Sequence, residues 1–97
     1  MKLTKNMTQQ IKTILKERNV KKASIFGSFA RGDAAENSDL DLIVEPFEKN
    51  YFELAAIKND LEENLNIKIN LVTYNVLDYP ENKDIKKKID QEKVNII

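Results

Sequence analysis

Apolar residues recur at two spacings along the chain, and each spacing predicts one kind of secondary structure. They return every three or four positions in residues 4–18, 51–64 and 85–89, which predicts three amphipathic helices. Thr4 or Asn6 can cap the first of these helices through a side-chain oxygen. The apolar stripe of each helix is expected to face a core.

Between these helices the apolar residues alternate with polar ones, as is typical of strands. The alternation is strict in residues 38–45 and returns in residues 67–73. Residues 20–26 form a short apolar run that ends at a glycine, and residues 94–97 predict a final edge strand. The small and polar residues 29–37 predict a short helical turn followed by a loop. The expected order is helix, strand, strand, helix, strand, helix, strand.

Composition narrows the classes of protein that fit this pattern. With 97 residues and 41% apolar content, the chain suits one compact domain with a small core. Its 16 basic and 16 acidic residues cancel, so the broad positive field of an unselective nucleic-acid binder is absent and no direct nucleic-acid contact is expected. The first ten residues are polar and no run of about 18 apolar residues occurs, which predicts a cytoplasmic protein without a membrane partner.

The absence of two residue types narrows the chemistry as well. The chain contains no cysteine and no histidine. Disulfides, thiolate zinc sites and imidazole bases are thereby excluded. Any catalysis must use carboxylates, hydroxyls, lysine or metal ions.

Asp39 and Asp41 stand two positions apart on the strand predicted for residues 38–45. At roughly 3.3 Å per residue, their side chains leave the same face with alpha carbons about 6 to 7 Å apart. Two carboxylates at that separation repel each other unless a cation lies between them, and magnesium prefers such oxygen ligands. The pair indicates a magnesium site, although an isolated Asp-x-Asp at a strand end is also compatible with two solvated carboxylates.

Gly27 and Ser28 follow directly on the first predicted strand. A strand, a glycine turn and a helix start present backbone N–H groups and a hydroxyl to an anion. Glycine allows close approach of a phosphate, and the serine hydroxyl can donate a hydrogen bond without adding bulk. On its own this dipeptide is most often an ordinary turn, so its meaning depends on the aspartate pair.

Taken together, residues 27–32 (GSFARG) and 38–44 (SDLDLIV) resemble the signature of the DNA polymerase beta-like nucleotidyltransferase superfamily. The family pattern is a Gly-Ser, a second glycine four residues after the serine, a short gap, and a Ser-Asp-x-Asp that leads into an apolar strand. Each part is present at the usual spacing. The short chain is most similar to the MNT-type minimal nucleotidyltransferases, which are paired with HEPN-domain proteins.

The resemblance implies a role for each motif residue. It implies nucleotide-binding positions at Gly27, Ser28, Arg31 and Ser38. Among these, Gly27 and Ser28 would hold the β and γ phosphates, whereas for Arg31 a solvated surface role is an equal alternative. It further implies that Asp39 and Asp41 are catalytic residues that ligate magnesium.

The resemblance also implies a fold and an activity. The fold is an α/β (α+β) domain over residues 1–97, with a mixed, mostly antiparallel sheet of about four strands flanked by helices. The activity is transfer of AMP from ATP, with magnesium, to a tyrosine hydroxyl of a HEPN-domain ribonuclease toxin. The chain would then be the antitoxin of a toxin-antitoxin system and the HEPN toxin would be its partner.

The third catalytic position departs from the family pattern. Members that catalyse transfer carry a third carboxylate on the neighbouring strand, and the matching residue here is Asn70. An amide can offer a neutral oxygen to a metal but cannot accept a proton, and loss of a general base typically costs about 10²- to 10⁴-fold in rate. Glu45 lies roughly 13 Å along the strand from Asp41 and should miss the same ion. Asn70 is open to three interpretations: an attenuated enzyme, a locally bonded strand residue, or a substitution of the natural residue.

Two other hypotheses remain open from the sequence. The chain could be a nucleotide-binding antitoxin that neutralises its toxin by complex formation, with little or no transfer. Separately, the run Lys86-Lys87-Lys88 could contact RNA, phosphate or an acidic partner surface. The acidic residues close to this run favour a solvated helix face instead.

Overall fold

The regular structure follows the predicted order of elements. The computed structural model describes residues 3–47 and 50–97. The helices are α1 (Lys5–Glu17), α2 (Gly27–Arg31), α3 (Tyr51–Leu65) and α4 (Lys83–Glu92). The strands are β1 (Lys22–Phe26), β2 (Leu40–Glu45), β3 (Ile69–Thr73) and β4 (Val94–Asn95). Two 3₁₀ turns that the sequence pattern did not predict, η1 (Tyr74–Asp78) and η2 (Pro80–Asn82), connect β3 to α4.

The elements differ from the prediction mainly at their ends. β1 begins later than expected, at Lys22, and β2 begins at Leu40. Asn19 adopts a left-handed conformation with φ 60°, which turns the chain between α1 and β1 before the strand can start. The helical turn expected within residues 29–37 is α2, which starts earlier, at Gly27, directly where β1 ends.

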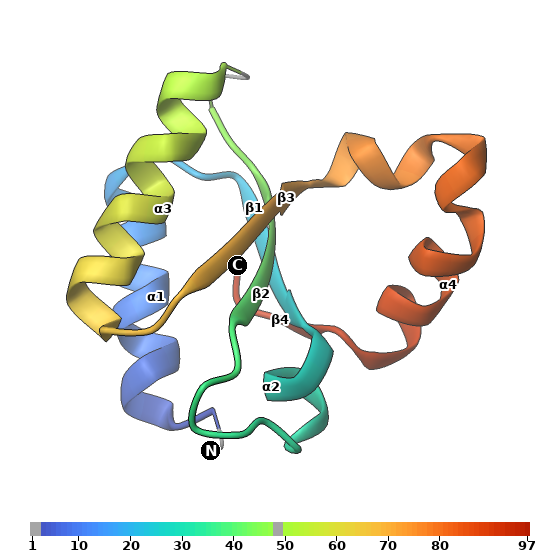
Figure 1. The fold of residues 1–97 in the computed structure, drawn as a ribbon. Helices are drawn as coiled ribbons and strands as arrows, with labels where there is room; N and C mark the ends of the chain where they lie inside the picture. Colours follow the sequence, from blue (N-terminus) through green and yellow to red (C-terminus); the bar gives the residue numbers. More distant parts are fainter. Residues whose placement is uncertain (1–2, 48–49) are drawn as a thin grey trace.

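The four strands in the described part of the chain form one mixed sheet in the order β3-β2-β1-β4 (Figure 1). β1 pairs antiparallel with β2 and with β4, and β2 pairs parallel with β3. The parallel pair is connected through α3, because parallel neighbours require a crossover connection. The mixed, mostly antiparallel sheet is therefore confirmed, and β4 lies at an edge as predicted.

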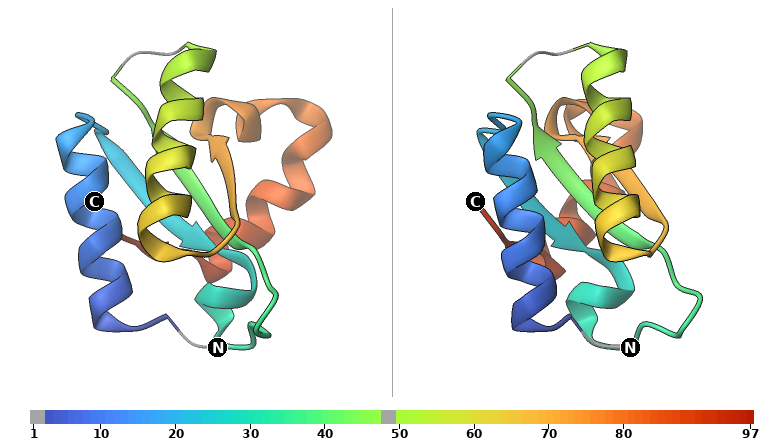
Figure 2. Two further views of the ribbon diagram at one scale, coloured as in Figure 1. Left: turned by 60° about the vertical axis from the view of Figure 1, so that its left-hand side comes forward. Right: turned by 90° about the vertical axis from the view of Figure 1, so that its left-hand side faces the viewer.

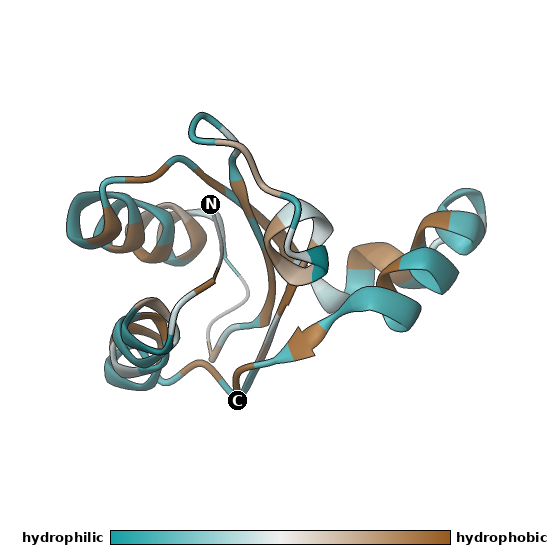
Figure 3. Cartoon of the chain, turned by 90° about the horizontal axis from the view of Figure 1, so that it is seen from below, coloured by the Kyte–Doolittle hydropathy of each residue, from teal (hydrophilic) through white to brown (hydrophobic). Residues whose placement is uncertain are grey.

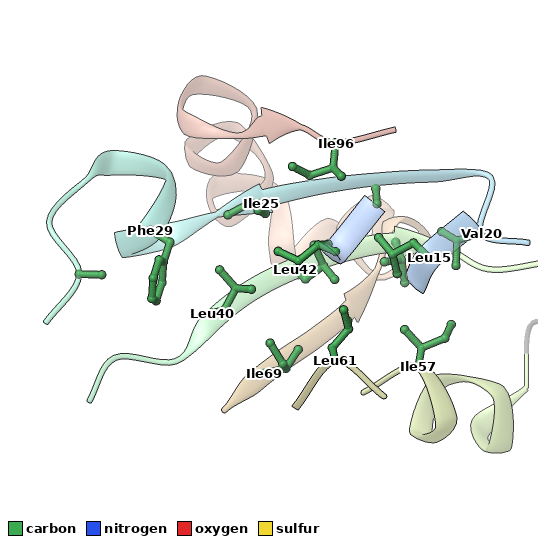
Figure 4. Close-up of a cluster of buried hydrophobic side chains, with 14 residues drawn as sticks. Leu15, Val20, Ile25, Phe29, Leu40, Leu42, Ile57, Leu61, Ile69 and Ile96 are labelled. Atoms are coloured by element: carbon green, nitrogen blue, oxygen red, sulfur yellow. The ribbon is translucent and has the colours of Figure 1, made fainter. Parts of the chain in front are cut away.

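α1 and α3 cover one face of the sheet and bury the larger core (Figure 2). Alternation along β2 directs Leu40, Leu42 and Val44 into this layer, and all three side chains are fully buried. Other strands and helices complete the cluster shown in Figure 4 with Leu15, Ile25, Phe29, Ile57, Leu61 and Ile69. The two helices are also joined by an ion pair between Arg18 Nη2 and Asp60 Oδ2 at 2.6 Å.

α4 lies on the opposite face of the sheet, where a smaller apolar cluster attaches it (Figure 1). Ile43, Leu77 and Ile89 are buried in this cluster. The rest of α4 is mostly hydrophilic, as its colouring in Figure 3 shows. Because side chains alternate along β2, Ile43 lies on the same face as Asp39 and Asp41. The aspartates therefore face the side of the sheet on which α4 packs.

The N-termini of the two long helices, α1 and α3, are capped by side chains. Thr4 Oγ1 accepts a hydrogen bond from the Met7 N–H at 3.1 Å, so it is the cap that α1 uses. Asn50 Oδ1 accepts one from the Glu53 N–H at 2.8 Å at the start of α3. Across residues 3–47 and 50–97, no helix combines the length and the apolarity that are required to traverse a bilayer.

Truncation of a core side chain on β2 tests this arrangement. Leu42→Ala should lower the free energy of unfolding by about 2 to 5 kcal/mol, because it leaves a cavity in place of a fully buried side chain. Phe52→Ala is the control: that side chain is 85% exposed, and its loss should change the free energy by less than about 0.5 kcal/mol. Urea unfolding followed by circular dichroism measures both, and equal losses would contradict the assignment of this core.

Candidate functional site

The two aspartates lie where β2 starts, between the end of β1 and the start of β3. Asp39 directly precedes β2 and Asp41 is its second residue. The register of the sheet pairs Asp41 with Phe26 on one side and with Asn70 on the other. These two pairings bring the Gly27 turn and Asn70 to the same aspartate from distant parts of the sequence.

The side chains of Asp39, Asp41 and Asn70 converge on one point. Asn70 Nδ2 donates to Asp39 Oδ2 at 3.2 Å and to Asp41 Oδ1 at 3.0 Å. The two carboxylates thus leave the chain on the same side, with the amide nitrogen between them. A donor in this position relieves the repulsion between neighbouring carboxylates, as a cation would.

The atoms around this point fit a magnesium ion. Two carboxylates supply the hard oxygen ligands that magnesium prefers, and a half-turn of the Asn70 amide presents Oδ1 in place of Nδ2. Among the described residues, no group of three acidic, histidine or cysteine side chains is placed to hold a metal. Glu45, at the far end of β2, lines a separate hollow of about 410 Å³. No other described carboxylate therefore takes the third place.

Gly27 lies where the chain passes the start of β2. Its φ of +74° is a left-handed conformation that residues with a Cβ rarely adopt. A Cβ at this position would collide with Asp41 Oδ2 and lie 3.1 Å from Asp41 Cγ. The glycine therefore allows the backbone to contact the side chain of Asp41 directly.

The two serines of the motif have different surroundings. Ser28 lines a pocket beside Gly27, and its hydroxyl makes no hydrogen bond to another described residue. Ser38 Oγ accepts a hydrogen bond from the Ala35 N–H at 2.8 Å, and the Ser38 N–H donates to the Ala35 carbonyl at 3.1 Å. Ser28 is thus open to a ligand, whereas Ser38 closes the turn that leads into Asp39.

Arg31 is fixed at the edge of the Gly27 turn by two carboxylates. Its Nε donates to Asp33 Oδ2 at 3.1 Å, and its Nη1 lies 3.1 Å from Glu92 Oε2. These hydrogen bonds, first to Asp33 and then to Glu92, raise the pKa of the Arg31 guanidinium above its already high usual value. The side chain is therefore a cation throughout the physiological pH range.

A pocket of about 370 Å³ opens beside Gly27 and extends to α4. The motif contributes Gly27, Ser28, Arg31 and Asp41 to its wall, and α4 contributes Ile85, Lys88, Ile89 and Glu92. The contribution of α4 is absent from the sequence prediction. The available signal was helical spacing, because positions 85, 88, 89 and 92 recur at intervals of three and four and so share one helix face.

The lysine-rich run on α4 does not form a single basic patch. Lys86 Nζ pairs with Asp78 Oδ1 at 3.0 Å, and Lys93 Nζ, just after the helix, pairs with Asp90 Oδ1 at 3.3 Å. The pair of Lys86 is in line with the solvated helix face, and Lys93 lies beyond the helix. Lys88 differs, because it lines the pocket and has no ion-pair partner among the described residues.

Comparison with protein families accounts for this arrangement. Residues 9–97 match the family model described as polymerase beta, nucleotidyltransferase. The chain belongs to this nucleotidyltransferase family. The match includes the Gly27 turn, the aspartate pair and Asn70, so the family model covers every part of the site.

Relatives from Methanocaldococcus jannaschii are similar to this nucleotidyltransferase in sequence. "Putative protein adenylyltransferase MJ0435" is 44% identical over 68 residues, which cover 69% of this chain and 73% of the relative. A second relative of the same description, MJ1217, is 35% identical over 94 residues, which cover 95% of this chain and 93% of the relative. The similarity of the second relative therefore extends over nearly the whole of both chains.

Solved structures share the fold of this nucleotidyltransferase. A structure described as a "putative minimal nucleotidyltransferase" superposes with a TM-score of 0.75 at 26% identity, covering 92% of this chain and 88% of that one. A toxin-antitoxin crystal structure with AMP-PNP gives a TM-score of 0.76 at 16% identity, over 93% and 72%. A complex of a tri-AMPylated Shewanella oneidensis HEPN toxin with an MNT antitoxin gives 0.71 at 12% identity, over 98% and 72%. At these last two identities the likeness concerns the fold alone.

A comparison of the two glycines of the motif tests the contact between Gly27 and Asp41. Gly27 and Gly32 both have positive φ, so alanine should cost about 1 to 2 kcal/mol of stability at either position. Only Gly27→Ala adds a collision, because nothing lies within 4 Å of a Cβ at Gly32. We expect Gly27→Ala to lose at least about 1 kcal/mol more than Gly32→Ala in chemical denaturation. Equal losses would show that the close approach to Asp41 is not a constraint.

Proposed function

We propose that this chain is a magnesium-dependent adenylyltransferase that modifies a tyrosine hydroxyl of a HEPN-domain toxin and thereby acts as its antitoxin. The observation that carries the proposal is the convergence of Asp39 and Asp41 on one point directly beside the Gly27 turn. Ligands for a divalent cation and donors for phosphate oxygens then lie side by side. Transfer from a nucleoside triphosphate depends mainly on such positioning and charge stabilisation.

Each residue of the site has a binding role in this proposal. Asp39, Asp41 and the Asn70 carbonyl oxygen would hold magnesium, which supplies neutralisation of phosphate charge. The Gly27 N–H and the Ser28 hydroxyl would donate hydrogen bonds to oxygens of the β and γ phosphates. These donors would hold the leaving pyrophosphate group in place while the acceptor approaches from the other side.

The proposed reaction joins the acceptor tyrosine oxygen to the α-phosphorus of ATP. One P–O bond forms, the bond between the α-phosphorus and the oxygen that bridges to the β-phosphate breaks, and pyrophosphate leaves. The proton of the tyrosine hydroxyl would pass to solvent water, because Asn70 is a neutral amide and cannot accept it. We therefore expect a slower transfer than at a site with a carboxylate in this position.

Two comparisons support the choice of a protein acceptor. The relatives that cover most of this chain are named protein adenylyltransferases. The fold is shared with a structure in which an MNT antitoxin is bound to an AMPylated HEPN toxin. A tyrosine as the acceptor follows from the resemblance to MNT-type nucleotidyltransferases, and cytoplasmic action on such a partner is part of the same proposal.

A second candidate is a nucleotide-binding antitoxin that neutralises its toxin by complex formation. The observation that favours it is the amide of Asn70, which contacts both aspartates where catalytic relatives would carry a carboxylate. Both candidates use the same fold and the same phosphate donors. They differ in whether AMP reaches the partner.

Mass spectrometry of the partner distinguishes the two candidates. The protein is incubated with ATP, magnesium and a HEPN-domain protein encoded beside it, and the intact mass of that partner is followed with time. Asn70→Asp should raise the rate of AMP addition by at least about tenfold, because it restores a carboxylate at the third position. Asp41→Asn is the control and should abolish addition. An unmodified partner in a stable complex would favour the second candidate, and an unchanged rate in Asn70→Asp would contradict the role given to residue 70.

Magnesium binding can be measured without any acceptor. Magnesium at about 100 times its dissociation constant should raise the free energy of unfolding by about 2.7 kcal/mol. Asn70→Asp should be less stable than the natural chain without magnesium and should gain more from it, because a third carboxylate adds both repulsion and a ligand. Thermal unfolding with and without magnesium gives the result, with Asp84→Asn as a control outside the site. A rise that persists in Asp39→Asn/Asp41→Asn would place the ion elsewhere.

A further inference from the structure

Glu92 occupies one of the two donors to which the proposed function assigns phosphate, the Gly27 N–H, and it also pairs with the neighbouring Arg31. Its Oε1 accepts a hydrogen bond from the Gly27 N–H at 3.1 Å. Arg31 Nη1 lies 3.3 Å from Oε1 and 3.1 Å from Oε2 of the same carboxylate. Backbone N–H groups and guanidinium groups bind carboxylate and phosphate oxygens in the same way. The chain thus provides its own anion at this position.

The surroundings of Glu92 show why this contact forms. Gly27 is buried, and a buried backbone N–H that finds no acceptor costs free energy. The side chain of Glu92 is only 15% exposed, so its charge also requires the donors that Gly27 and Arg31 provide. Each group therefore satisfies the other.

We propose that Glu92 is an internal placeholder for a nucleotide phosphate, which holds Gly27 and Arg31 until a triphosphate displaces it. The inference rests on the proposed nucleotide site and adds a regulation of that site. The apparent affinity for ATP is reduced by the fraction of molecules in which Glu92 is in place. Whatever draws Glu92 away from Gly27 raises the affinity for ATP.

Neighbouring charges favour the exchange of carboxylate for phosphate. Asp33 still holds Arg31 Nε at 3.1 Å when Glu92 leaves, so the guanidinium remains at the edge of the pocket. Lys88 lines the same pocket from one turn earlier in α4, and its ammonium attracts the incoming phosphate. Glu92 is the last residue of α4, so its side chain can turn towards solvent while the helix stays intact.

The placeholder acts only against ligands that carry phosphate. Adenosine carries no anionic group that could replace the Glu92 carboxylate, so its binding should not depend on this residue. A general change in the pocket would alter the binding of adenosine and of ATP together. The ratio of the two affinities therefore isolates the contact of Glu92 with Gly27 and Arg31.

Isothermal titration calorimetry of the full chain tests the proposal, with magnesium-ATP and adenosine as ligands. Glu92→Gln keeps the size of the side chain and removes its charge, and Glu92→Ala removes the acceptor. We expect both to bind ATP about three- to tenfold more tightly, with no change for adenosine. Asp90→Asn is the matched control, because it removes one negative charge from the same helix at a residue that pairs with Lys93 outside the pocket. Its affinity for ATP should equal that of the natural chain.

Each other outcome overturns a defined part of the argument. If the natural chain binds ATP and the Glu92 variants bind it equally or more weakly, Glu92 is not a competitor, and the nucleotide site stands without it. If Asp90→Asn increased the affinity for ATP as much as the Glu92 variants do, the increase would come from net charge alone, and the proposal would be wrong. Failure of every variant and of the natural chain to bind ATP would remove the proposed function and the inference with it. Circular dichroism checks that each variant is folded. If Glu92→Ala is unfolded, the affinity of Glu92→Gln for ATP tests the proposal.

Discussion

The close approach of Gly27 to Asp41 is the constraint on which the rest of the site depends. The antiparallel register sets Phe26 against Asp41, so the next residue of the chain must pass directly over the carboxylate. A Cβ there would displace the Asp41 carboxylate, and the positive φ of Gly27 turns the chain directly into α2. That short helix then sets Arg31 towards α4. The buried side chains of β2, Leu40 and Leu42, hold the register that makes all of this possible.

The charges of the site are balanced by contacts within the chain. Two carboxylates share the amide of Asn70, and the cationic Arg31 is shared by two further carboxylates. Of the charged residues that line the pocket, Arg31, Asp41 and Glu92 each contact a polar partner, whereas Lys88 has no such partner within residues 3–47 and 50–97. A bound metal-nucleotide complex would replace these internal partners one by one. Such contacts would hold the side chains in place before a ligand binds, which would lower the entropic cost of the proposed binding.

The fold and the centre of the site could be predicted from the sequence because both depend on local patterns. Strict alternation gave β2 its two faces and placed Asp39 and Asp41 together, and the spacing of the motif indicated the family. The contact between Glu92 and Gly27 could not be predicted in this way, since it joins residues 65 positions apart. That contact depends on where α4 lies, which is determined by the two 3₁₀ turns and by packing of Ile89 on the sheet. The turn closed by Ser38 is likewise a matter of local hydrogen bonding that the family motif does not specify.

The amide of Asn70 also affects how the protein folds before it binds any ligand. With an aspartate there, three anions would meet at the junction of β2 and β3, and the native state would depend on a cation as soon as the chain left the ribosome. With Asn70, two N–H bonds hold the same side chains together without a cation. We expect such a protein to mature independently of the magnesium supply of the cell. In the proposed function, Asn70 would lower the rate of transfer and would also let the protein fold before magnesium or a nucleotide binds.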